Sequence, residues 1–256
     1  MIEYFNNNFD VIISVKDLSV QYDDRVIIDN ISFDVYRGEV FVIVGRSGCG
    51  KSTLLRQLIG LETPTTGTII INGDNFTEAD EKMTISIMRR NGVLFQFNGL
   101  FASMTLAENI ELILEKYTGL TPRQMRSAVD LKLSLVGLSG FQNYKPSEIS
   151  GGMKKRAALA RAMALDPAIL FFDEPSSGLD PITAVSLDNL IKELNSSLKT
   201  TMIIVTHDLA SILSISHRII MLDANIKGIL ATGTPEELKN YKANQEVYNF
   251  FNRTFC

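Results

Sequence analysis

The chain has 256 residues, of which 45% are hydrophobic, and its mean hydropathy is +0.11. This length suits one large domain with a substantial core, which would bury roughly 70 to 75% of the surface of the unfolded chain. The formal net charge of −4 argues against a general electrostatic grip on nucleic acid, so we expect no nucleic-acid partner.

Every apolar run is shorter than a membrane-spanning helix requires, and each is bounded by polar residues. The N-terminus lacks the basic and apolar regions of a secretory signal. The two cysteines, Cys49 and Cys256, are expected to be free thiols in a reducing compartment. We therefore expect a protein of the cell interior.

Two kinds of apolar pattern predict two kinds of strand. Alternating apolar residues predict an antiparallel side sheet, with strands at Ile12–Val15, Leu18–Tyr22, Ile31–Val35 and Thr68–Ile71. Continuous apolar runs predict strands buried on both faces of a parallel core sheet, at Val40–Val44, Val93–Phe95, Ile169–Phe172, Met202–Val205 and Ile219–Leu222. The fold class is therefore predicted to be α/β.

The segment between Phe101 and Leu165 is predicted to be mostly helical. Thr121-Pro122 is typical of an N-cap followed by proline, and strong helix formers follow Met153. We expect a single domain over residues 10–256, with a helical subdomain at approximately 100–165 and a C-terminal tail at approximately 241–256.

One unbroken motif lies between the predicted strand Val40–Val44 and a predicted helix, and it reads Gly45-Arg46-Ser47-Gly48-Cys49-Gly50-Lys51-Ser52-Thr53. Its glycines let the backbone turn sharply and point N–H groups inward, and the helix N-terminus adds positive potential. Lys51 is expected to reach the β- and γ-phosphates of a nucleoside triphosphate, and Ser52 to bind Mg²⁺. A plain glycine-rich turn is the alternative, but it would need neither residue.

The apolar run Ile169–Phe172 ends in two adjacent carboxylates. Asp173 is expected to orient the Mg²⁺ shell, and Glu174 to polarise the water that attacks the γ-phosphate. We expect Pro175 to hold the backbone of Glu174 in an extended conformation. The alternative is a strand that ends in a solvated acidic turn.

A second predicted phosphate site lies at Ser150-Gly151-Gly152, ahead of a helix that begins near Met153. Three cations in the first turn of this helix oppose its dipole, which predicts an external negative group or an acidic neighbour; they are Lys154, Lys155 and Arg156. One nucleotide could not use both loops of one subunit. An ordinary serine N-cap with solvated charges is the alternative.

The order of these motifs resembles the ATP-binding cassette family of ATPases over nearly the whole chain. The resemblance implies a P-loop NTPase (RecA-like) fold that binds ATP and Mg²⁺, and an ATP sandwich dimer in which the signature of one copy closes over ATP held by the other. It identifies Gly45–Thr53 as Walker A, Ile149–Met153 as the signature, Ile169–Asp173 as Walker B, Glu174 as the catalytic base and Ser177–Asp180 as the D-loop. It also identifies Gln96 as the Q-loop glutamine near the metal, His207 as the switch histidine and Tyr22 as the aromatic that stacks on adenine.

Some of these assignments have alternatives. The signature has Ile149 and Met153 where the commonest form has leucine and glutamine, so a direct glutamine contact to nucleotide is not carried over. The alternatives are a strand aromatic for Tyr22, a polar strand end for Gln96 and a buried, hydrogen-bonded ring for His207.

The resemblance implies an energy-coupling ATPase that lies on the cytoplasmic face of the cell membrane, because the chain has no membrane path of its own and needs permease subunits. A soluble cassette ATPase acting on ribosomes or DNA usually carries two cassettes or a coiled-coil insertion. A regulatory subunit without turnover would be expected to lack Glu174, Lys51 or His207.

The segment Phe95–Phe101, followed by Met104, resembles the ATPases of phospholipid and solvent-resistance transporters. Those systems pair the ATPase with a permease and a lipid-binding protein that carries a mammalian cell entry domain. Transport of another small solute is the alternative. The aromatic C-terminal segment Tyr248–Asn252, with Phe255 beyond it, is expected either to pack on its own domain or to dock on a partner.

Overall fold

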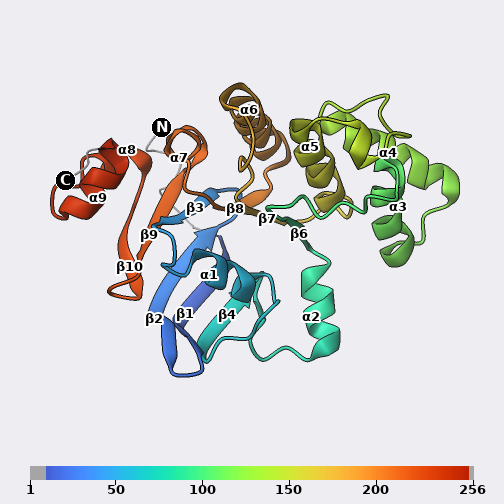
Figure 1. The fold of residues 1–256 in the computed structure, drawn as a ribbon. Coiled ribbons are helices and arrows are strands. Elements are labelled where there is room, and N and C mark those ends of the chain that lie inside the picture. Colours follow the sequence, from blue (N-terminus) through green and yellow to red (C-terminus); the bar gives the residue numbers. More distant parts are fainter. Residues whose placement is uncertain (1–9, 254–256) are drawn as a thin grey trace.

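The computed structural model describes residues 10–253 and contains two sheets with helices around them (Figure 1). The first sheet is antiparallel and has the strand order β2-β1-β4-β5. Its strands are β1 (Val11–Tyr22), β2 (Arg25–Tyr36), β4 (Thr66–Ile71) and β5 (Asp74–Asn75). This sheet confirms the predicted antiparallel side sheet.

β1 is one strand where the sequence pattern predicts two. Its pairing with β2 shifts register between Val15 and Leu18, and Asp17 lies in this irregularity with a φ of 50°. The irregularity interrupts the alternation of buried and exposed residues, because an extra residue in one strand moves the following side chains to the other face.

The second sheet has six strands in the order β10-β9-β3-β8-β7-β6. They are β3 (Val40–Gly45), β6 (Asn91–Leu94), β7 (Ile169–Asp173), β8 (Thr201–Val205), β9 (Arg218–Asp223) and β10 (Gly228–Gly233). β3, β6, β7, β8 and β9 are parallel, as predicted, and β10 pairs antiparallel to β9. β10 was not predicted, because its two glycines and its half-buried side chains give neither apolar pattern.

The helices between β6 and β7 lie beyond the β6 edge of this sheet (Figure 1). They are α3 (Leu106–Tyr117), α4 (Pro122–Leu135), the 3-10 helix η2 (Pro146–Glu148) and α5 (Gly151–Ala162). Thr105 and Thr121 each begin a helix with a capping box, in which Glu108 and Gln124 bond back to the cap. The predicted start of α4, with Thr121 as N-cap and Pro122 as the first helical residue, is confirmed.

The remaining helices are α1 (Lys51–Leu58), α2 (Glu81–Met88), α6 (Pro181–Leu198), α7 (Leu209–Ile215), α8 (Pro235–Lys239) and α9 (Gln245–Asn252). α8 and α9 lie at the opposite side of the molecule from α3, α4 and α5 (Figure 1). Within residues 10–253, no helix combines the length and the apolar character that crossing a bilayer requires.

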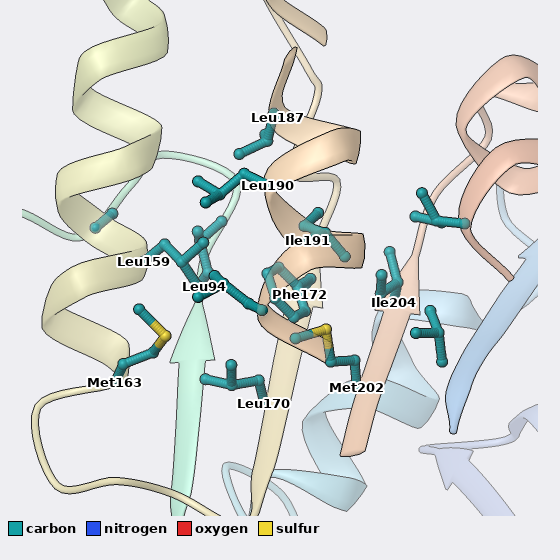
Figure 2. Close-up of a cluster of buried hydrophobic side chains, with 14 of the residues drawn as sticks. Leu94, Leu159, Met163, Leu170, Phe172, Leu187, Leu190, Ile191, Met202 and Ile204 are labelled. Atoms are coloured by element: carbon teal, nitrogen blue, oxygen red, sulfur yellow. The ribbon is translucent and has the colours of Figure 1, made fainter. Parts of the chain in front are cut away.

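A buried cluster fixes the positions of α5 and α6 over the core sheet (Figure 2). Leu159 of α5 and Leu190 of α6 pack against Phe172 of β7 in this cluster, and Leu94 and Ile204 join them from the neighbouring strands. Burying a side chain of this size contributes about 1.5–3 kcal/mol. The cluster therefore fixes the end of β7, where the two adjacent carboxylates follow.

Candidate functional site

A cavity of about 760 Å³ lies at the carboxyl ends of β3, β6, β7 and β8. Ligands gather at this edge of open parallel sheets, because the loops that leave the strands meet there. The cavity brings together twelve residues that the sequence predicted, namely Gly45, Arg46, Ser47, Gly48, Gly50, Lys51, Ser52, Thr53, Gln96, Asp173, Glu174 and His207. Three residues that were not predicted also line it: Arg25, Ile27 and Phe250.

The loop between β3 and α1 has the backbone geometry of an anion site. Gly45 has a φ of 147°, and a Cβ placed there would lie 2.4 Å from the carbonyl oxygen of Leu222, so only glycine fits without a shift. Gly50 has a φ of 99° and precedes α1 without a side-chain cap. The N–H groups at the start of α1 therefore remain available to an anion.

Lys51 holds this loop together from inside. Its Nζ donates to the carbonyl oxygens of Gly45, at 2.9 Å, and Arg46, at 3.1 Å. Cys49 is a free, buried thiol, and burial raises its pKa. The expected free thiol is thus confirmed for Cys49, whereas Cys256 lies outside the described residues.

Glu174 and His207 form a pair in the lining of the cavity. The imidazole Nδ1 of His207 lies 2.8 Å from Oε1 of Glu174, and the side chains are 71% and 14% exposed, respectively. The backbone N–H of Glu174 donates to the carbonyl oxygen of Val205 at 2.8 Å, which ties the end of β7 to β8. Because the side chain of His207 is mostly exposed, the alternative of a buried histidine ring is wrong.

The expectation of an extended backbone at Glu174 is also wrong. Glu174 has a φ of 47°, in the left-handed region that residues other than glycine rarely occupy. Proline at position 175 disfavours the right-handed helical region for the residue before it, and the left-handed turn avoids that region as well. A backbone in this region costs about 1–3 kcal/mol, and such strain concentrates at functional sites. The side chain of Glu174 lines the cavity.

Asp173 lies in an electrostatic environment that favours a bound cation. Burial raises the pKa of its carboxyl, and the neighbouring charge of Glu174 raises it further. Ser52 and Gln96 add oxygen donors to the same cavity. No cluster of three or more His, Cys, Asp or Glu side chains that could hold a metal occurs within residues 10–253. These oxygen donors fit Mg²⁺, which binds one or two protein carboxylates and takes its other ligands from phosphate and water.

Gln96 connects the cavity with α5. Its backbone carbonyl accepts a hydrogen bond from Nζ of Lys155 at 2.6 Å, and its Nε2 donates to Oγ of Ser177 at 3.4 Å. Lys155 is buried, and burial lowers its pKa. Arg156 donates to the carbonyl of Val136 at 2.8 Å. Lys155 also interacts electrostatically with Asp173 and Glu174, so the expected acidic neighbour is present for this cation. Arg156 bonds to a backbone carbonyl instead.

α5 begins at Gly151, two residues before the predicted start. Ser150 caps it by accepting a hydrogen bond from the N–H of Met153 at 3.3 Å. Gly151 and Gly152 therefore belong to the first turn, and a Cβ on Gly152 would lie 2.4 Å from Cγ2 of Thr183 in α6. The structure explains Gly152 by this close approach, and it places Ser150, Gly151 and Gly152 outside the lining of the cavity.

Three further predicted residues also lie outside the lining, namely Cys49, Tyr22 and Asp180. The hydroxyl of Tyr22 donates to the carboxylate of Glu62. Burial is the largest cause that raises the pKa of Tyr22, and this hydrogen bond raises it further. Asp180 caps α6 by accepting from the N–H groups of Ile182 and Thr183, and its hydrogen bonds lower its pKa. The adenine-stacking and D-loop roles of Tyr22 and Asp180 stay predictions.

The C-terminal aromatic segment packs on its own domain. In α9, Phe251 is buried, and Phe250 lines the cavity. This self-packing agrees with one of the two alternatives expected for the segment, and Phe255 lies outside the described residues. No sequence signal links Phe250 to the cavity, because the contact exists only once the sheets and α9 are assembled.

Residues 28–177 match the family described as ABC transporter. The intermembrane phospholipid transport system ATP-binding protein MlaF of Escherichia coli K12 is 42% identical over 229 residues, which are 89% of this chain and 84% of MlaF. The methionine import ATP-binding protein MetN of Brucella abortus is 40% identical over 88% of this chain and 60% of its own length. A dimeric structure of the ATP-binding cassette MJ0796 in a post-hydrolysis state, bound to ADP and Pi, matches with a TM-score of 0.78 and 30% identity over 87% of this chain and 98% of its own.

Proposed function

This chain belongs to the ABC transporter family and hydrolyses ATP, and we propose that the hydrolysis drives phospholipid transport through separate permease subunits. The observation that carries the proposal is the similarity to MlaF, which spans most of both chains. The similarity to MetN supports the alternative, a transporter of another small solute, but this chain spans a smaller share of that protein.

The residues that line the cavity would have separate roles in ATP binding and hydrolysis. The loop of residues 45–53 would bind the phosphates of ATP, with Lys51 toward the β- and γ-phosphates. Glu174 would orient the attacking water and accept its proton, and His207 would hold Glu174 in place and reach the γ-phosphate. Ser52, Asp173 and Gln96 would hold Mg²⁺, which neutralises negative charge on the phosphates when it is bound.

We also propose that two copies of the chain form an ATP sandwich. Ser150, Gly151 and Gly152 are separated from the cavity, which supports their action on nucleotide held by a second copy. The dimeric structure of MJ0796 supports the same arrangement.

Ser150→Arg is expected to prevent the ATP-dependent dimer, because it places a long cationic side chain at the proposed contact with the second copy. The test is light scattering during size-exclusion chromatography in a Glu174→Gln background with ATP. Ser127→Arg adds the same side chain on the exposed face of α4 and is the matched control. This control should still dimerise. Dimers of Ser150→Arg at the level of the parent would contradict the sandwich.

The permease is proposed to dock beside the segment that joins β6 to the helical subdomain. In this segment Phe97 is 88% exposed, and Phe95 and Phe101 are exposed too. Large exposed apolar side chains that cluster in one segment are typical of a protein interface. The segment contains Gln96, which lines the nucleotide cavity, so movement of the nucleotide site would reach the permease directly. The chain would therefore lie on the cytoplasmic face of the cell membrane.

Phe97→Ala is expected to lower ATP-driven transport severalfold while leaving the affinity for ATP unchanged, because Phe97 does not line the nucleotide cavity. The measurements are transport by the reconstituted complex and nucleotide binding by the same preparation. Ile226→Ala, at an exposed apolar residue of the β9–β10 turn, is the matched control. Equal transport by Phe97→Ala and the parent would remove this segment from the coupling path.

The transported substrate is tested with the intact complex. The chain is purified with its membrane subunits, the bound lipids are identified by mass spectrometry, and transfer of labelled phospholipid between vesicles is followed with ATP and with ADP. We expect copurified phospholipid, transfer with ATP only, and a lipid-binding protein with a mammalian cell entry domain in the complex. A complex that carries and moves no lipid, and whose ATPase responds to a soluble solute-binding protein, would support the alternative solute.

A further inference from the structure

A second cavity, of about 630 Å³, lies between α9 and the loops that carry Glu174 and His207. Glu246, Asn249, Phe250 and Arg253 line it from the α9 side. Phe250 and Arg46 line both this cavity and the nucleotide cavity. The C-terminal helix therefore forms a wall of the region in which ATP is hydrolysed.

α9 is anchored firmly in this place. Val247 and Phe251 are buried in the main core cluster, and Asn244 caps the helix by accepting from the N–H groups of Glu246 and Val247, at 2.9 and 3.2 Å. A helix held by its buried face also holds the backbone of the residues on its other face, and Glu246 is one of these.

Glu246 forms an ion pair with the phosphate-binding loop. Nε of Arg46 lies 3.2 Å from Oε1 of Glu246, and the side chains are 75% and 30% exposed. Arg46 is the second residue of the phosphate-binding loop and lines the nucleotide cavity. Its guanidinium thus links this loop to a carboxylate of α9. Guanidinium groups bind phosphate oxygens as well as carboxylates, with the same planar donors.

We propose that Glu246 competes with the phosphates of ATP for Arg46, so that the C-terminal helix sets the affinity of the nucleotide site. Polyphosphate carries more charge than one carboxylate, and Arg46 lies in the loop that surrounds it. ATP therefore takes over the guanidinium, and the ion pair with α9 is weakened in return, because coupling between two binding events is reciprocal. This inference concerns nucleotide affinity and goes beyond the proposed transport of lipid.

The first test measures the dissociation constant of adenosine 5′-(β,γ-imido)triphosphate, with Mg²⁺, for the purified full chain and its Glu246→Gln variant. The variant loses the competing charge and keeps the side-chain shape, so we expect binding about two- to fivefold tighter, the range for a partly exposed ion pair. The gain should shrink at high salt, which screens such pairs. Glu236→Gln, at an exposed carboxylate of α8, should bind like the parent.

A double-mutant cycle separates competition for Arg46 from general repulsion between Glu246 and the nucleotide. In an Arg46→Gln background, Glu246→Gln should no longer tighten binding, because the contested guanidinium is gone. Equal tightening in both backgrounds would overturn the proposal in favour of general repulsion. An unchanged or weaker affinity of Glu246→Gln in the parent background would overturn it as well. The assay contains neither permease nor lipid, so its result is independent of the transported substrate.

Discussion

Replacing Glu174 by glutamine is expected to lower the rate of ATP hydrolysis about 10²- to 10⁴-fold, the usual contribution of a general base. Glutamine has the shape of glutamate and can still bond Nδ1 of His207, so the 2.8 Å pair and the turn at position 174 are retained. What it loses is the basic carboxylate that orients water and accepts its proton. Affinity for ATP should stay within a few-fold of the parent, because Lys51 and the phosphate-binding loop are unchanged.

The measurements are phosphate release at saturating ATP and nucleotide affinity, both with the purified protein or complex. Glu193→Gln makes the same chemical change at an exposed position of α6 and should leave both values unchanged. Hydrolysis by Glu174→Gln at the rate of the parent would show that another group activates the water. A loss of ATP binding instead would assign Glu174 to nucleotide binding.

The fold could be predicted largely from continuous and alternating apolar runs. β3 and β8 are buried along their whole length, and between Gly45 at one end of β3 and Thr201 at the start of β8 their other residues are all apolar, which is typical of strands buried on both faces. The phosphate-binding loop could be predicted because Gly45 and Gly50 take positive φ values and Lys51 bonds to carbonyls of its own loop, all within one short stretch of sequence. The cavity then assembles at one sheet edge because parallel strands end on the same side.

The parts that could not be predicted depend on contacts between distant segments. Lys155 bonds to the backbone carbonyl of Gln96, which lies far from it in the sequence, so the charge pattern of α5 could not identify this partner. Gly152 looks like a flexible residue in the sequence, whereas its small size serves the contact with Thr183. The ion pair between Arg46 and Glu246 joins segments that are far apart in the sequence, and no local pattern marks it.

The left-handed backbone of Glu174 shows a different limit. Proline at the next position excludes one helical conformation but leaves both the extended and the left-handed regions open. The bond from the N–H of Glu174 to Val205 and the pairing with His207 select the left-handed one, and both partners come from β8 or the residues that follow it. The sequence therefore predicts which residues carry the chemistry, and tertiary contacts decide their orientation.

Lys51→Met is expected to weaken ATP binding by roughly 10- to 100-fold for each bond to phosphate that is lost, because a hydrogen bond to a charged group contributes about 1.5–3 kcal/mol. The variant also removes the donor that Gly45 and Arg46 share, at 2.9 and 3.1 Å, so the loop loses its internal brace when no phosphate is bound.

Nucleotide affinity is measured by titration, and thermal unfolding of the same sample shows whether the loop change spreads to the whole domain. Lys16→Met removes the same charge from an exposed position on β1 and should change neither value. Hydrolysis should fall at every ATP concentration that leaves the weakened site unsaturated. It should stay low at saturation as well, since Lys51 also stabilises the charge that develops on the phosphates during transfer. If Lys51→Met binds ATP like the parent and unfolds at the same temperature, Lys51 serves only the carbonyls of its own loop, and another cation must hold the phosphates.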